Sequence, residues 1–230
     1  MAALFVSEIG PYASDDRFDA YGVSRDARTY SGPHPVVAHP PCERWGRMAK
    51  GSPTAQRFEI GDDSGCFAAA LDAVRRFGGV LEHPQGTHAF RRFRLPIPPK
   101  KGWSAPDEHG GRSCYIDQGA YGHPAKKPTW LYAVLPVFPE LDWTRVWGRP
   151  RIGGDGFHSA RERARAKARV GGIKPFPQIP ADWRWKTPDR LKTLLHDLAA
   201  SARGFRPSVV APAQSVLFAG SDNELGRDVA

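Results

Sequence analysis

Short apolar runs separated by turn residues dominate the first 135 positions of the chain. Residues 65–77 break this pattern, because their apolar side chains recur at helical spacing. Six runs have the length and composition of strands, the second of them with a turn: 2–6, 18–30, 36–38, 80–84, 114–118 and 129–134. Strands alternating with a helix, and polar residues at the strand tips, predict an open α/β sheet that binds ligands beyond its carboxyl edge.

The second half of the chain has a weaker pattern. Thr187-Pro188 opens a predicted helix that continues to about Ser201, with leucines on one face. Residues 159–169 fit either a charged helix or a solvated arm. We expect a mobile loop at 43–60 and a Pro-rich basic loop at 91–112. The interpretation is a single α/β domain over residues 1–202, followed by a poorly ordered tail at 203–230.

Charge adds a candidate partner. The formal net charge is +9, and the basic residues cluster between positions 91–101 and 145–169. Such clusters attract phosphate and release its counterions, and interleaved tryptophans favour a nucleic-acid surface. A merely solvated basic surface is the alternative. We expect DNA as the partner and no membrane, because no apolar run reaches the roughly 20 residues that a span needs.

The 3 cysteines give no disulfide framework. A reducing cytoplasm, in a bacterium or a phage-infected host cell, is therefore the expected location. Neither a Cys-x-x-Cys nor a His-x-x-x-His pair occurs in the sequence, so we expect no metal.

Four short segments carry candidate chemistry. The first ends in Pro40-Pro41-Cys42, and the second is the turn at 61–67 that leads into the predicted helix. The third ends in Glu82-His83-Pro84. The fourth is Tyr121-Gly122-His123-Pro124-Ala125-Lys126-Lys127, which leads into the last predicted strand.

In this order, the segments resemble the cytosine carbon-5 DNA methyltransferase family over residues 36–134. In that family a Pro-Pro-Cys tip supplies the nucleophile, the next strand ends in Glu-Asn-Val or Glu-Asn-Pro, and a Tyr-Gly-x-Pro-x-Arg-Arg stretch follows. The resemblance implies a Rossmann-like, methyltransferase-type open sheet, reduced in size and with loop-rich insertions. It also implies a transferase that modifies cytosine carbon 5 in DNA through a covalent cysteine adduct.

The roles follow from that chemistry. Cys42 as a thiolate would add to ring carbon 6 and make carbon 5 reactive, while Glu82 would protonate or hydrogen-bond ring nitrogen 3. The target base has to leave the duplex to reach such a thiol. The resemblance gives eight candidate substrate-binding residues: Pro41, Arg44, Trp45, His83, Gln118, Tyr121, Lys126 and Lys127.

The resemblance implies S-adenosylmethionine as cofactor, with Phe5, Gly10, Asp26 and Pro40 as the candidate binding residues. The family's Phe-x-Gly-x-Gly loop is replaced here by residues 5–11, its Asn is replaced by His83, and residues 135–186 are short for its target-recognition region. Three alternatives therefore stay open. The chain has changed its cofactor, or it acts on a free pyrimidine nucleotide, or it binds DNA without catalysis on a degenerate methyltransferase scaffold.

Overall fold

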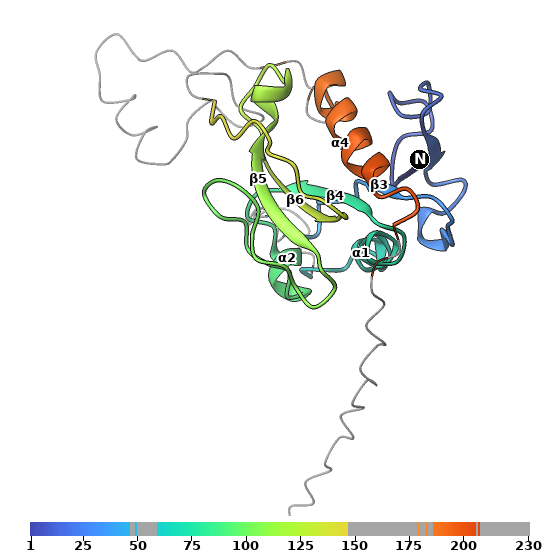
Figure 1. Ribbon diagram of the computed structural model, residues 1–230. Helices are drawn as coiled ribbons and strands as arrows, with labels where there is room; N and C mark the ends of the chain where they lie inside the picture. Colours follow the sequence, from blue (N-terminus) through green and yellow to red (C-terminus); the bar gives the residue numbers. More distant parts are fainter. Residues whose placement is uncertain are drawn as a thin grey trace, which may run out of the picture.

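A six-stranded mixed sheet forms the centre of the molecule (Figure 1). The computed structural model describes residues 1–46, 49, 59–146, 179, 183, 186–205 and 207. The strands are β1 Ala2–Leu4, β2 Asp19–Tyr21, β3 Val36–Ala38, β4 Gly79–Pro84, β5 Arg112–Asp117 and β6 Pro128–Val134. Their order is β2-β1-β3-β4-β6-β5, with the first four parallel and β6 antiparallel to both its neighbours. The predicted open α/β sheet is confirmed, and it is compatible with a Rossmann-like fold.

In the described part of the chain, one long helix packs on each face of the sheet. Helix α1 (Cys66–Phe77) packs on one face, and α4 (Asp189–Ser201) packs on the other. Alternation along the strands supplies both cores: Val36 and Ala38 face α1, whereas Val37 faces the α4 side. The apolar spacing in the sequence therefore predicted both helices correctly, because each buries the stripe that the spacing defines.

Some short elements were not predicted from the sequence. Helix α2 (His88–Arg92) begins after Thr87, whose side chain accepts a hydrogen bond from Ala89 N–H. It is too short to show a periodic pattern. Two 3₁₀ turns, η1 (Ala27–Thr29) and η2 (Gln118–Tyr121), follow β2 and β5. Residues 159–169 and most of the predicted loop at 43–60 lie outside the described residues.

The chain changes direction across the sheet at β1. Strand β2 lies on one side of β1, and β3 and β4 lie on the other. In open α/β sheets the crevice beyond the carboxyl ends at such a reversal is the usual ligand site. The carboxyl ends of β1, β3 and β4 lie along this edge, and the segments after them carry the chemistry described below.

Candidate active site

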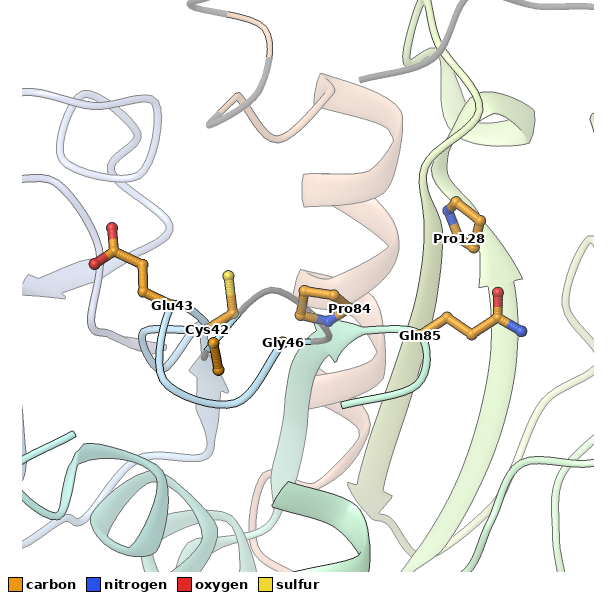
Figure 2. Close-up of a pocket in the computed structure, with 7 residues that line it drawn as sticks. Cys42, Glu43, Gly46, Pro84, Gln85 and Pro128 are labelled. Atoms are coloured by element: carbon orange, nitrogen blue, oxygen red, sulfur yellow. The ribbon is translucent and has the colours of Figure 1, made fainter. Parts of the chain in front are cut away.

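Cys42 lies at the carboxyl edge of the sheet, four residues beyond the end of β3. It lines a cavity of about 480 Å³. Figure 2 shows Cys42 on the turn after β3, Pro84 at the end of β4, and Pro128 at the start of β6. The remaining lining residues are Glu43, Gly46, Ala49 and Gln85. The candidate nucleophile therefore faces a space between three strand ends.

Glu82 lies near the end of β4, and both of its carboxylate oxygens accept hydrogen bonds. His39 Nδ1 lies 3.1 Å from Oε2, and Gln118 donates from Nε2 to Oε1 at 3.1 Å. Burial alone would raise the pKa of Glu82. The hydrogen bond and charge of His39, together with the charge of Lys127, outweigh burial and lower the pKa to about 2. Glu82 is therefore an ionised acceptor at neutral pH.

These contacts extend into a five-residue polar chain. The Tyr12 hydroxyl lies 2.7 Å from His39 Nε2, and Gln118 also donates to Thr129 Oγ1 at 2.9 Å. The polar chain thus consists of Tyr12, His39, Glu82, Gln118 and Thr129. A carboxylate only accepts, so His39 donates from Nδ1–H to Glu82, and in the neutral ring Nε2 accepts from Tyr12. Burial and the charge of Glu82 raise the pKa of Tyr12 far above its ordinary value, so its hydroxyl remains a donor.

Cys42, Glu82 and Lys127 share one electrostatic environment. Burial raises the pKa of the Cys42 thiol, the charge of Glu82 raises it further, and the charge of Lys127 acts in the opposite direction. Burial lowers the pKa of Lys127, whereas the charges of Glu82 and Cys42 act to raise it. The structure therefore brings together three of the residues that the sequence singled out, and Gln118 joins them through Glu82.

Three other candidate substrate-binding residues lie in the core. His83 is fully buried against Phe67, with ring centroids 5.2 Å apart. Trp45 is 4% exposed and donates its indole N–H to Asp63 at 2.7 Å. Tyr121 packs into the core on the α4 side, and its hydroxyl donates to the Asp142 carbonyl at 3.1 Å. None of the three offers a free face to a base.

The last three candidates lie nearer the surface. Pro41 is exposed, and Arg44 and Lys126 are partly exposed. Arg44 also accepts a hydrogen bond from Gly61 N–H at its carbonyl, at 2.9 Å. This contact ties the turn after β3 to the segment that leads into α1.

The candidate cofactor residues do not form a cradle for S-adenosylmethionine. Residues 5–18 connect β1 to β2 through turns, so no helix N-terminus follows β1 to face a charged ligand. Both carboxylate oxygens of Asp26 accept from the Arg28 guanidinium at 2.8 Å. The Gly10 N–H donates a hydrogen bond to the Ser7 carbonyl, and Pro40 is buried. Phe5 packs against the α1-side core. These residues do not fit the cofactor.

Three members of the polar chain were not singled out by the sequence as catalytic or binding residues: Tyr12, His39 and Thr129. The signal for His39 was its place directly after a buried strand and before two prolines. Tyr12 carried no signal, because its contact with His39 depends on the fold of the turns at 5–18.

Comparison with models of protein families, with curated proteins and with solved structures gave no match. Within the described residues, no helix is long and apolar enough to cross a membrane. No group of three or more His, Cys, Asp or Glu side chains in the same part of the chain is arranged to hold a metal ion.

Proposed function

We propose that this chain modifies a pyrimidine base in DNA through a covalent adduct on Cys42. The observation that carries the proposal is the placing of Cys42 in a cavity at the carboxyl edge of the sheet, with Glu82 and Lys127 coupled to it electrostatically. A thiol, a carboxylate and an amine are the groups that nucleophilic addition to a pyrimidine needs. The resemblance of residues 36–134 to cytosine carbon-5 DNA methyltransferases points to the same reaction.

The chemistry begins at the Cys42 sulfur. The thiol gives its proton to water, and the sulfur forms a bond to ring carbon 6. The carbon 5–carbon 6 double bond opens, and its electron pair is delocalised over carbon 5, ring nitrogen 3 and the carbonyl oxygen. In this proposal Lys127 donates to the oxygen that gains charge, and Glu82 accepts an N–H of the Watson–Crick edge. Carbon 5 then attacks the carbon group of an electrophilic co-reactant, whose leaving group departs with the bonding electron pair. Water takes the carbon 5 proton, the carbon 5–carbon 6 double bond forms again, and the sulfur leaves carbon 6 as a thiolate that regains a proton from water.

DNA is the proposed substrate because the chain carries a formal charge of +9, which favours a polyanion. A base has to leave the duplex to reach Cys42. Cys42 remains a reduced thiol in the cytoplasm that we propose as its location.

Modified duplex DNA tests the proposal. With 5-azacytosine in place of cytosine, carbon 6 is more electrophilic, and an adduct forms without a co-reactant. With 5-fluorocytosine, the adduct persists only after a group has been added to carbon 5. We expect a covalent complex by intact mass with 5-azacytosine DNA, its loss in Cys42→Ser, and its retention in Cys66→Ser.

The remaining arms separate the alternatives. An adduct with 5-fluorocytosine DNA that requires S-adenosylmethionine would assign that cofactor despite the turns after β1. An adduct with the free nucleotide but not with DNA would favour the nucleotide-modifying alternative. DNA binding with no adduct in any arm would overturn the proposal in favour of non-catalytic binding.

A further inference from the structure

We propose that His39 is a positioning residue that holds Glu82 as a hydrogen-bond acceptor, so that the site selects a pyrimidine edge presenting an N–H group. This inference rests on the proposed function, because it names the part of the base that the same site reads. It starts from the 3.1 Å contact between His39 Nδ1 and Glu82 Oε2. Each of the two side chains is 14% exposed, so the pair is largely shielded from solvent. Pro84 and Lys127's neighbour Pro128, which line the cavity, lie next to this part of the sheet.

The backbone fixes His39 from both directions. Its N–H donates to the Leu4 carbonyl at 3.0 Å, which extends the β1–β3 pairing by one residue. Pro40 follows, and a residue before proline is restricted to extended conformations. The imidazole then bridges two elements, because Nδ1 meets Glu82 and Nε2 meets the Tyr12 hydroxyl at 2.7 Å. An imidazole ring can make both contacts at once, because one of its nitrogens donates and the other accepts.

The hydrogen bonds on Glu82 determine what it offers a ligand. His39 and Gln118 each occupy one of its oxygens, and each oxygen keeps a further lone pair. Burial opposes the charge, but the contact with His39 keeps the pKa of Glu82 low, so the free lone pairs belong to a carboxylate. A carboxylate accepts from the cytosine amino group or from the ring N–H of uracil or thymine. It repels a ring edge that carries acceptors alone.

The other ionisable groups near the pair come from several elements. Tyr12 contacts His39 directly. The charge of Lys127 acts on Glu82, and Glu82 acts in turn on Cys42. His83 lies next to Glu82 on β4, and the charges of His39 and Glu82 both act on it. A test of His39 therefore has to follow the titration of Glu82 itself.

Carbon-13 NMR of labelled glutamate carboxyls follows that titration, with the Glu82 signal assigned by its loss in Glu82→Gln. We expect the signal to titrate about one pH unit or more higher in His39→Leu than in the wild type, because a hydrogen-bond donor to the carboxylate is lost. His39→Asn keeps a donor and should shift less. His109→Asn, which changes a histidine 3.6 Å from Glu108, is the control and should leave Glu82 unchanged. An unchanged Glu82 titration in His39→Leu would overturn the inference.

The rate of adduct formation with 5-azacytosine DNA gives the second readout. We expect His39→Leu to slow the first turnover roughly 10- to 100-fold with DNA affinity nearly unchanged, and His39→Asn to recover most of the rate. DNA carrying N4,N4-dimethylcytosine, whose pairing edge has no N–H, should compete at least about tenfold less well than cytosine DNA. Equal competition, or equal rates in all variants, would contradict the inference. If the wild type formed no adduct but the titration of Glu82 still moved to higher pH in His39→Leu, the proposed function would be overturned. The contact between His39 and Glu82 would remain supported.

Discussion

His39 Nδ1 lies 3.1 Å from Glu82 Oε2, although 43 residues separate the two in the sequence. The register of the sheet explains the meeting. Ala38 pairs with Leu81 in neighbouring parallel strands, so the residues that follow them lie side by side. The pair is therefore built by regular sheet geometry at the edge where ligands bind in open α/β folds.

Glu82→Gln tests the carboxylate at the centre of the polar chain. The glutamine keeps the shape but places an amino group where one of the two donors, His39 or Gln118, now points. We expect adduct formation to fall by roughly 10²- to 10⁴-fold, as measured by single-turnover kinetics with 5-azacytosine DNA. Glu108→Gln, which changes a side chain that is 77% exposed and lies outside the cavity lining, is the control and should stay within threefold of the wild type, on the order of a 0.6 kcal/mol change in barrier. Equal rates in Glu82→Gln and the wild type would remove Glu82 from the reaction.

Alkylation of Cys42 tests the electrostatic coupling without any DNA. The charge of Glu82 raises the pKa of the Cys42 thiol, and the charge of Lys127 lowers it. At a fixed pH near 7.5, iodoacetamide should therefore modify Cys42 faster in Glu82→Gln and more slowly in Lys127→Gln. Lys101→Gln, a change in an exposed loop, should leave the rate unchanged. If the alkylation rate of Cys42 changed in the same direction in Glu82→Gln and Lys127→Gln, the opposite electrostatic effects of these two residues on Cys42 would be contradicted.

The pH dependence of stability tests the buried His83. Burial lowers its pKa to about 4 from 6.5, so between these values the unfolded chain binds a proton that the folded chain does not. The free energy of unfolding should fall as the pH drops from 6.5 to 4, by up to about 1.4 kcal/mol per pH unit. Urea titrations of His83→Leu should show a smaller slope in this window than those of the control His88→Gln, which changes an exposed residue. An equal slope in both variants would mean that His83 is protonated in the folded state.

Glu82 contributes in a different pH window. Its pKa is lowered from 4.5 to about 2, so its stabilisation is complete above 4.5 and is lost as the pH falls toward 2. The His39→Leu variant should lose part of the stability change between pH 4.5 and 2, which comes from Glu82. It should keep the change between pH 6.5 and 4, which comes from His83. Unfolding curves that are identical in His39→Leu and the wild type below pH 4.5 would argue against the pairing.

Trp45 tests whether a candidate substrate-binding residue, which would stack on a base, is instead part of the core. Its indole packs against Phe67 and Phe93 and donates to Asp63. Trp45→Ala should cost about 3–5 kcal/mol in the free energy of unfolding. Trp143→Ala, at a partly exposed position, should cost less than half as much. A loss of DNA affinity with unchanged stability in Trp45→Ala would support the stacking role instead.

The sequence predicted the sheet and its two long helices because their signals are local. Alternating or continuous apolar runs mark the strands, and the spacing of residues such as Phe67 and Val74 marks α1. Cys42 and Glu82 could also be predicted as site residues from the sequence, because Cys42 follows a buried strand and Glu82 lies near the end of another. Their meeting at one edge is a consequence of parallel strands, which the pattern already indicated.

The rest of the site depends on tertiary structure. Alternation along β4 turns Glu82 and His83 to opposite faces, so only one of these neighbours can belong to the site. Trp45 lies in a polar segment of the sequence, yet it packs against Phe67 and Phe93 and is buried. The contact of Tyr12 with His39 depends on turns whose fold has no periodic signal. Local sequence could assign none of these three outcomes.

The most direct measurement of the central claim is peptide mapping of the covalent complex with 5-azacytosine duplex DNA. We expect the nucleotide mass to be attached to the peptide containing Cys42, and the peptides of Cys66 and Cys114 to be unmodified. We also expect the complex to be lost in Cys42→Ser and weakened in Glu82→Gln. A complex that maps to another residue, or the absence of any complex while the protein binds DNA, would contradict a nucleophilic role for Cys42.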